Sequence, residues 1–244
     1  MEDKRLLILI EHEYRKSRNT YGSPRVFHAL KRQGIRIGRK RVERLMREAG
    51  LRARVVKYYR RLAGLHRFFN SIENLRLDSD KPTRINQLWA GDITYLKVNK
   101  KWRYLATVMD VYSRRIISWS LGKAKNTQLT IGVLEKAIKK RQPNNGLIFH
   151  TDRGSEYRSY EVQDVLEKHD MIPSMNRPYH CVDNAEIESF FKTLKGDVIR
   201  GKKYESDQTL RQELQGYINH FYNKQRLHSS LGYLSPLEYE KISA

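Results

Sequence analysis

The chain has 244 residues and one cysteine, so it exceeds one average domain of about 100–200 residues and excludes an intrachain disulfide or a multi-cysteine zinc site. No apolar run approaches the ~20 residues of a membrane-spanning helix, and residues 1–10 carry too many charges for a signal peptide, so we expect a cytoplasmic protein. The 48 Lys and Arg against 27 Asp and Glu give a net charge of +21, which indicates a polyanionic partner.

The excess of positive charge is concentrated near the N-terminus. Residues 1–70 contain 20 Lys and Arg against 6 Asp and Glu, whereas residues 71–244 contain 28 against 21. This asymmetry favours nucleic-acid binding. A merely solubilising basic surface and an RNA-bound protein of ribosomal type are the alternatives.

Residues 1–50 have the apolar spacing of three short helices. The second is expected to begin with Ser23 as its cap and Pro24 in the first helical position, and the third to end at Gly50. The outward face of the third helix carries Arg39, Lys40, Arg41, Arg44 and Arg47. We expect this segment to be a helix-turn-helix domain whose basic helix contacts DNA in the major groove. A helical bundle with a basic exterior is the alternative.

Residues 51–83 read as a basic linker in which aromatic residues alternate with Lys and Arg. Such a segment either follows a phosphate backbone and stacks on bases, or uses its aromatic side chains to dock on a neighbouring domain. We place the domain boundary at residue 84, a catalytic core over 84–200 and a helical extension over 201–244.

From residue 84 onward the pattern changes to strands. Three alternating runs with short separators predict hairpin-connected strands over Trp89–Val98, Trp102–Met109 and Ile116–Leu121. Helical segments then alternate with short strands at Leu147–Phe149 and Met171–Pro173, and a further helix follows Asp183. The order predicts an α/β fold, a mixed sheet flanked by helices.

Three acidic residues stand out in this basic chain. Asp92 lies in the first predicted strand, Asp152 directly follows a buried one, and Glu188 lies on the helix after Asp183. Buried carboxylates are costly unless they are paired or bound to a metal. Converging carboxylates suit Mg²⁺ or Mn²⁺, and paired divalent ions promote phosphoryl transfer. Spacing alone leaves open that the aspartates only form turns.

Three segments carry a resemblance to retroviral-type integrase cores: Trp89–Tyr95, His150–Ser155 and Asp183–Lys195, with 35 residues between Asp152 and Glu188. More narrowly, they resemble transposases of the bacterial insertion-sequence-three family, in the form made from the downstream reading frame (OrfB type). Further similarities to this family lie at Tyr21–Arg25 and at Tyr222–Tyr233.

The resemblance implies a ribonuclease-H-like fold that holds Asp92, Asp152 and Glu188 around two Mg²⁺ ions, with Mn²⁺ as a substitute. It implies a DNA transposase of the DDE type, which nicks transposon 3′ ends and joins the freed 3′-hydroxyl to another phosphodiester. His150 and Asn184 are expected to support the site.

Periodicity does not distinguish Glu188 from its neighbour Glu186, because both flank the apolar stripe of their helix. Lys192 and Lys195 lie four and seven residues after Glu188, where they would meet a DNA phosphate, and they favour Glu188 weakly. An ordinary surface ion pair is the alternative reading of both lysines. The motif is the main reason for choosing Glu188.

A hydrolase triad of Ser155, His180 and Cys181 is disfavoured because no nucleophile-elbow pattern surrounds the serine. Two other classes of function stay open: a DNA-binding regulator without catalysis, and a nuclease that cuts without joining. The chain also reads as a catalytic half that needs an upstream-frame fusion partner. We expect double-stranded transposon ends and target DNA as partners, a homo-oligomer, and a location in the bacterial cytoplasm at the nucleoid.

Overall fold

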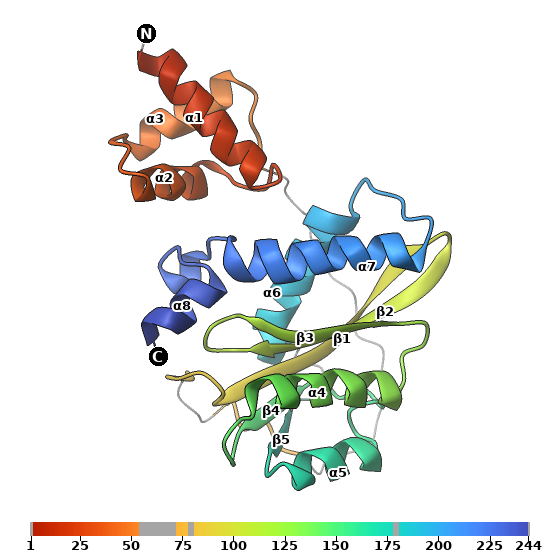
Figure 1. Ribbon diagram of the computed structural model, residues 1–244. Helices are drawn as coiled ribbons and strands as arrows, with labels where there is room; N and C mark the ends of the chain where they lie inside the picture. The colour runs from red at the N-terminus through yellow and green to blue at the C-terminus, as the bar shows by residue number, and fades with distance from the viewer. Residues whose placement is uncertain (1, 54–71, 78–80, 178–180, 244) are drawn as a thin grey trace.

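The computed structural model describes residues 2–53, 72–77, 81–177 and 181–243 (Figure 1). The N-terminal domain consists of α1 (Glu2–Lys16), α2 (Ser23–Arg32) and α3 (Arg39–Glu48). One apolar face of each helix is buried in a shared core, formed by Leu6, Ile10, Val26, Leu30, Val42, Leu45 and Met46. The predicted helical domain is therefore confirmed.

The start of α2 differs from the prediction. Gly22, with extended backbone at φ −87° and ψ 175°, is the N-cap, and no side chain caps the helix. Ser23 is instead the first helical residue, and Pro24 follows it within the first turn, where a missing N–H costs no hydrogen bond. At the end of α3 the expected stop is present, since Gly50 adopts φ +68°.

The second domain is built on one mixed sheet of five strands in the order β3-β2-β1-β4-β5. β1, β2 and β3 pair antiparallel, whereas β4 and β5 run parallel to β1. Their bounds are β1 (Leu88–Val98), β2 (Lys101–Asp110), β3 (Ile116–Gly122), β4 (Ile148–Thr151) and β5 (Ile172–Met175). The predicted mixed sheet is confirmed, although β4 begins one residue later than expected and Ile148 is only half-buried.

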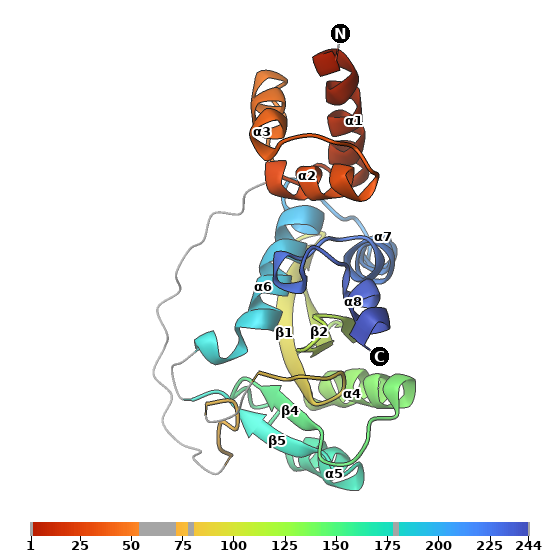
Figure 2. The same cartoon turned by 90° about the vertical axis from the view of Figure 1, so that its left-hand side faces the viewer.

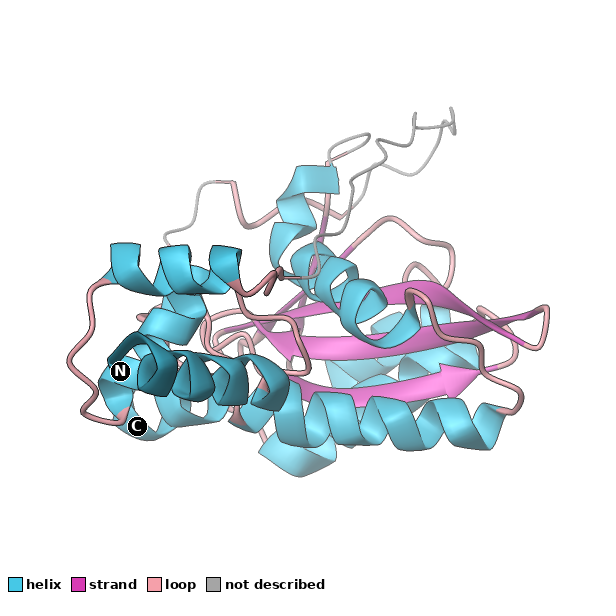
Figure 3. Cartoon of the chain, turned by 90° about the horizontal axis from the view of Figure 1, so that it is seen from above, coloured by secondary structure: helices cyan, strands magenta, loops and turns pink. Residues whose placement is uncertain are grey.

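Helices cover both faces of the sheet, as Figures 1 and 3 show. On one face lie α4 (Thr127–Arg141) and α5 (Tyr160–Lys168), and on the other α6 (Ala185–Leu194) and α7 (Asp207–Gln215). The alternation of side chains along each strand supplies both cores. In β1, Leu88 and Ala90 pack towards α6 and α7, whereas Trp89 packs towards α4.

The last part of the chain continues these helices. A short turn, η1 (Cys181–Asn184), precedes α6, which runs on into the π-helical turn η2 (Lys195–Ile199), and α7 runs on into η3 (Gly216–Tyr222). The chain ends with η4 (Ser229–Leu231) and α8 (Pro236–Ser243). None of the helices in the described ranges is both long and apolar enough to cross a lipid bilayer.

The N-terminal domain docks on this C-terminal part of the chain (Figure 2). The Tyr21 hydroxyl accepts a hydrogen bond from the Leu227 N–H (2.8 Å) and donates one to the Gln225 carbonyl (3.2 Å). Nε of Arg25 donates to the Leu227 carbonyl (3.0 Å). The first and last of the segments that resemble the transposase family are thus in contact, 200 residues apart in sequence.

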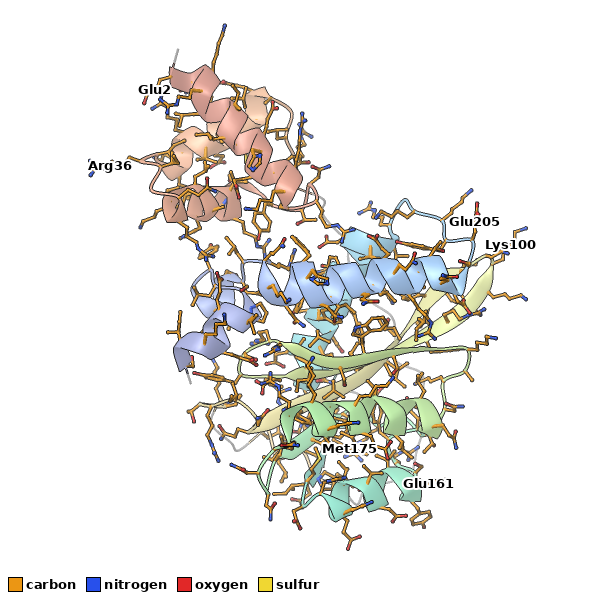
Figure 4. The ribbon with its side chains drawn as sticks, viewed as in Figure 1. Glu2, Arg36, Lys100, Glu161, Met175 and Glu205 are labelled. Carbon is orange, nitrogen blue, oxygen red and sulfur yellow. The ribbon has the colours of Figure 1, made fainter. Side chains whose placement is uncertain are left out.

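A second long-range contact lies at the end of the sheet where the turn between β1 and β2 is found. The turn between β1 and β2 meets the segment before α7, where the Asn99 N–H donates to the Tyr204 carbonyl (2.9 Å). Figure 4 shows Lys100 and Glu205, from these two segments, at the same corner of the molecule. The C-terminal part of the chain is therefore tied to the sheet at this corner.

Candidate active site

Asp92 and Asp152 are neighbours because of the register between two parallel strands. Gly91 of β1 pairs with Thr151, the last residue of β4, and each aspartate directly follows one of these partners. Adjacent strands lie about 4.8 Å apart, which places the two carboxylates side by side. Both side chains are half-buried. The predicted convergence of these two acids is present.

Two glycines make room for this pair. A Cβ on Gly91 would come within 2.5 Å of Phe149 Cζ. A Cβ on Gly154 would come within 2.9 Å of an Asp152 carboxylate oxygen and 2.4 Å of the Glu156 carboxylate. Any side chain at either position would therefore displace the acids or the residues that pack beneath them.

Backbone amides hold both carboxylates in place. The Ile93 N–H donates to Asp92 Oδ1 (2.7 Å), and the Gly154 N–H donates to Asp152 Oδ1 (2.9 Å). Each carboxylate is thus fixed by a group that belongs to its own loop or strand. The orientation of the pair is set locally once the two strands are paired.

The site concentrates negative charge. Burial, followed by the charge of Asp152 and then of Glu188, raises the pKa of Asp92 well above its usual range. Burial also raises the pKa of Asp152, although the Gly154 amide and Lys125 oppose the shift. For Glu188, burial and then Asp152 raise the pKa. All three predicted acids therefore interact with one another.

The two acids of α6 have different surroundings. Glu186 is paired with Arg76 (Nη2–Oε2 2.8 Å) and with Arg114 (Nη1–Oε1 3.5 Å). The pKa of Glu188 is raised by burial and then by the charge of Asp152. Of the two, Glu188 is thus the acid that interacts electrostatically with the aspartates, as the motif favours.

A lysine that the sequence did not single out lies beside the acids. Nζ of Lys125 forms an ion pair with the buried Glu156 carboxylate at 2.7 Å. Glu156 and the two aspartates raise the pKa of Lys125 against the opposing effect of burial. No signal pointed to Lys125, because it lies in the loop after β3 and 27 or more residues from either aspartate.

Tyr157 is a second neighbour that sequence reasoning missed. Its hydroxyl is buried and has no hydrogen-bond partner among the described residues. Burial and then the charges of Asp92 and Asp152 raise the pKa of this hydroxyl well above its usual range. It therefore stays protonated as an unused hydrogen-bond donor near the acids.

The two predicted supporting residues have different positions. Asn184 is buried, and its Nδ2 lies 3.4 Å from the Gly91 carbonyl, directly before Asp92. His150 is fully buried between β4 and β5, with Nδ1 2.8 Å from Ser174 Oγ and Nε2 2.7 Å from Asn176 Oδ1. Burial lowers the pKa of His150 to about 4, so this residue joins the strands as a neutral ring.

The two predicted DNA-contacting lysines lie beyond Glu188 on the same helical run. Lys192 is exposed on α6. Nζ of Lys195 lies 4.4 Å from the centre of the Tyr95 ring on β1, which fixes this ammonium group over the sheet. A DNA contact of either lysine stays a prediction.

The basic residues of α3 differ in their ion pairing. Arg39, Lys40, Arg44 and Arg47 are exposed, and Arg47 forms a long ion pair with Glu43 (Nη2–Oε1 3.8 Å). Arg41 contacts Glu2 and Asp3 of α1, and Arg44 contacts Asp3 and Glu48. Figure 4 shows Arg36, in the loop before α3, projecting away from the domain on the same side as this helix.

Part of the predicted linker packs on the catalytic domain. The Leu75 N–H donates to Ser174 Oγ (3.0 Å), and Asn74 Nδ2 donates to Asp183 Oδ2 (2.7 Å). The predicted aromatic residues of this linker, Tyr58, Tyr59, Phe68 and Phe69, lie outside the described residues.

The three acids are not yet arranged as a closed metal site. Within the described ranges, no three His, Cys, Asp or Glu side chains are gathered closely enough to hold a metal ion. Their chemistry nevertheless fits a divalent cation, since all three donors are carboxylates, burial raises the pKa of each, and repulsion between them adds to the shift at Asp92 and Glu188. A bound cation would remove this repulsion.

Comparison with known proteins gives the family. Residues 1–59 match an HTH-like domain, and residues 82–181 and 188–243 match two integrase core domain families. The chain is 34% identical over 239 residues to an uncharacterized 31 kDa protein of insertion element IS600 from Shigella sonnei, covering 98% of this chain and 88% of that protein. It is 37% identical over 227 residues to transposase InsF of insertion sequence IS3A from Escherichia coli K12, covering 93% and 79%. The chain belongs to the IS3 family of transposases.

Membership in the IS3 family makes the protein a DDE-type polynucleotidyl transferase by descent. The fold agrees. A chain of a simian T-cell lymphotropic virus intasome, solved in complex with the PP2A regulatory subunit B56 gamma, superposes with a TM-score of 0.52. That match has 18% sequence identity and covers 87% of this IS3 family chain and 69% of the viral one. The retroviral-type integrase fold expected from the sequence is therefore shown.

Proposed function

We propose that this IS3 family protein nicks the 3′ ends of its insertion sequence and joins them to target DNA, with Asp92, Asp152 and Glu188 as the catalytic acids. The observation that carries the proposal is the pairing of β1 with β4 directly before Asp92 and Asp152, together with the charge of Glu188 on α6, which raises the pKa of Asp92. Burying three like charges together is unfavourable in a structural core. A site that binds cations explains why the fold keeps them together.

The three carboxylates would hold two Mg²⁺ ions, for which Mn²⁺ would substitute. When bound, such ions activate a water or a 3′-hydroxyl and stabilise the leaving 3′-oxygen. Asp92 and Asp152 are already fixed by the Ile93 and Gly154 amides, so Glu188 is the ligand that would move to complete the site.

Other groups of the chain would bind and orient the DNA. The exposed cations of α3, Arg39, Lys40 and Arg47, would contact one DNA segment, and Lys192 and Lys195 would contact phosphates near Glu188. His150 and Asn184 would support the acids from beneath, the first by joining β4 to β5 and the second by contacting Gly91.

The protein would act as a homo-oligomer, because two transposon ends must be joined to one target in a coordinated way. An upstream-frame protein is a further partner that we propose for full activity. A test of oligomerisation is the mass of the complex with paired-end DNA, and a monomer on such DNA would contradict this part of the proposal.

The experiment that tests the function compares two neighbouring acids. The full chain, Glu188→Gln and Glu186→Gln would each be incubated with Mg²⁺ or Mn²⁺ and a labelled duplex carrying the terminal repeat. Products would be followed on a denaturing gel. We expect nicked and longer joined products from the wild type, a loss of about 10³-fold or more in Glu188→Gln, and less than about tenfold in Glu186→Gln.

Each alternative function has its own result in this assay. Nicking without joined products would favour a nuclease. DNA binding without any cleavage by the wild type would overturn the proposal in favour of a regulator, unless added upstream-frame protein restores cleavage. Equal losses in the two variants would contradict the assignment of Glu188.

A further inference from the structure

A cationic pocket lies on the side of α6 that faces away from the aspartates. It encloses about 360 Å³ between the N-terminal domain, α6 and residues 222–230. Three arginines from separate segments line it: Arg25 of α2, Arg114 of the β2–β3 turn and Arg226 after η3. Figure 2 shows α2 seated above the upper end of the helical run that contains α6. We call it the arginine pocket.

The positive charge of the arginine pocket exceeds the negative charge around it. Arg226 pairs with Asp197 (Nη1–Oδ2 3.3 Å). Among the described residues, the ion pair of Arg114 is a long one, 3.5 Å to Glu186, and Glu186 is already bound by Arg76 at 2.8 Å. Together with Arg25, four guanidinium groups share two carboxylates.

The excess of positive charge affects Arg25, the arginine that the N-terminal domain contributes. Nε of Arg25 donates to a neutral group, the Leu227 carbonyl (3.0 Å). Burial and then the charge of Arg226 lower the pKa of Arg25. An anion between the two guanidinium groups would remove this repulsion and replace the lost hydration.

Neutral hydrogen-bonding groups complete the lining. Nε2 of His228 is buried and has no hydrogen-bond partner in the part of the chain that the structure describes. Burial and the surrounding arginines lower the pKa of His228 to about 3, so its ring is neutral. The hydroxyl residues Ser189 and Thr193 line the pocket from α6. Guanidinium groups with hydroxyl donors are the usual partners of a phosphate ester.

The helix α6 links the pocket to the acids. Glu186, Ser189 and Thr193 are spaced three and four residues apart and line the pocket, whereas Glu188 does not line it and interacts electrostatically with Asp152. A helix with its side chains is about 10–12 Å wide, a distance that a DNA strand covers in about three nucleotides.

We propose that the arginine pocket binds one phosphodiester of the DNA held at the acids, a few nucleotides from the bond that is cut. This inference rests on the proposed function, because it takes the DNA of that reaction as the ligand. The pocket exists only when the N-terminal domain is docked, since Arg25 belongs to that domain. The bound phosphate would therefore join the position of the N-terminal domain to that of the scissile strand.

The test is a double-mutant cycle, in which one arginine of the protein and one phosphate of the DNA are changed singly and together. Arg114→Gln removes the pocket arginine with the weakest protein contact, in a Glu188→Gln background that prevents cutting. Labelled end duplexes would carry a single uncharged methylphosphonate at each position in turn. We expect one position where the methylphosphonate weakens binding about tenfold with Arg114 present and less than about threefold in Arg114→Gln.

Arg103→Gln is the matched control. Arg103 is likewise largely buried and paired with one acid, Asp207 (2.6 Å), but lies outside the pocket. It should show no position-specific coupling, and thermal unfolding would verify that both variants fold. No coupled position for Arg114, or the same coupling for Arg103, would overturn the proposal.

Two further results separate the possible failures. If inorganic phosphate binds in the pocket but no methylphosphonate position is coupled to Arg114, the pocket holds a free anion. That result would overturn the DNA contact. A wild type that cuts DNA without a coupled position would refute the pocket alone. A wild type that shows the coupling but never cuts would refute the proposed reaction and leave the pocket standing.

Discussion

Two clusters of like charge lie on opposite sides of α6, and they are built in different ways. The acids Asp92 and Asp152 are fixed by adjacent strands and by backbone amides of their own loops. The arginines of the arginine pocket come from three segments, and Arg25 joins Arg114 and Arg226 only through domain docking. The comparison teaches that the acidic cluster is a local property of the sheet, whereas the basic cluster depends on the whole chain.

The largest effect is expected where a pocket arginine also holds the fold together. Arg226 and Asp197 are both buried, and the Tyr217 hydroxyl donates to the same carboxylate oxygen (2.7 Å). Arg226→Met should lower the free energy of unfolding by about 3–5 kcal/mol, because it leaves Asp197 charged, buried and without its cation. Urea denaturation measures this loss.

The matching double variant tests the reason. Asp197→Asn added to Arg226→Met keeps an acceptor for Tyr217 and removes the stranded charge. Most of the lost stability should return. A double variant as unstable as the single one would show that Arg226 acts through packing instead.

On the acidic side, Gly91→Ala should be the most damaging substitution that changes no charge. The new Cβ would meet Phe149 Cζ at 2.5 Å and must push β1 away from β4. We expect a loss of about 1–3 kcal/mol in unfolding free energy and a larger loss of nicking, since Asp92 moves away from Asp152.

Gly132→Ala is the control for this substitution. Among the described residues, nothing lies within 4 Å of a Cβ added there, in the middle of α4. It should stabilise the protein by up to about 1 kcal/mol. If Gly91→Ala and Gly132→Ala changed the free energy of unfolding equally, close packing under Asp92 would be ruled out.

Asp92→Asn should raise the stability of the metal-free protein at pH 7. The pKa of Asp92 is raised in the folded state, so folded protein binds the proton more readily and stability falls as pH increases from the ordinary carboxyl pKa through the raised one. Removing the charge removes that loss. The melting temperature should rise about 2–4 °C for each kcal/mol gained.

The pH dependence is the check on Asp92→Asn. The difference from the wild type should vanish in acid, where the carboxyl is protonated in both the folded and unfolded protein. Added Mg²⁺ should stabilise the wild type more than the variant. A variant that is less stable than the wild type at pH 7 would contradict the repulsion.

The smallest effect on stability is expected for Lys125→Gln, which should destabilise the protein, whereas Asp92→Asn should stabilise it. Its ammonium group offsets Glu156 and the two aspartates, so its loss should destabilise the metal-free protein by less than about 1 kcal/mol, because the group is partly exposed and screened. High salt should reduce the effect. Thermal melting at two salt concentrations measures it, with the exposed Lys139→Gln as the control; a gain in stability would contradict the offset.

The elements of this protein follow from local patterns in its sequence. Apolar periodicity predicted α1 to α3, and alternation predicted β1, β2 and β3 close to their observed bounds. Such patterns depend on neighbouring residues and are legible without the fold. The exact cap of α2 was missed, since one residue of extended backbone has no strong signature.

The acids show the same division between what the local sequence predicts and what the fold decides. Asp92 and Asp152 were recognisable because both lie in family motifs, one within a predicted strand and one directly after another. Periodicity did not separate Glu188 from Glu186, and the motif chose Glu188. The fold then gives the two acids different environments, with Arg76 and Arg114 against Glu186 and the charge of Asp152 acting on Glu188.

What the sequence by itself determined is thus the set of elements, the family motifs and the acids that those motifs contain. Tertiary structure alone decided which charges face one another: Lys125 beside the aspartates, and Arg25 beside Arg226 across the two domains. The physical reason is the distance over which each effect acts. Backbone periodicity is imposed by residues a few positions apart, whereas an electrostatic contact depends on distance in space, which segments 200 residues apart in this chain acquire only on docking.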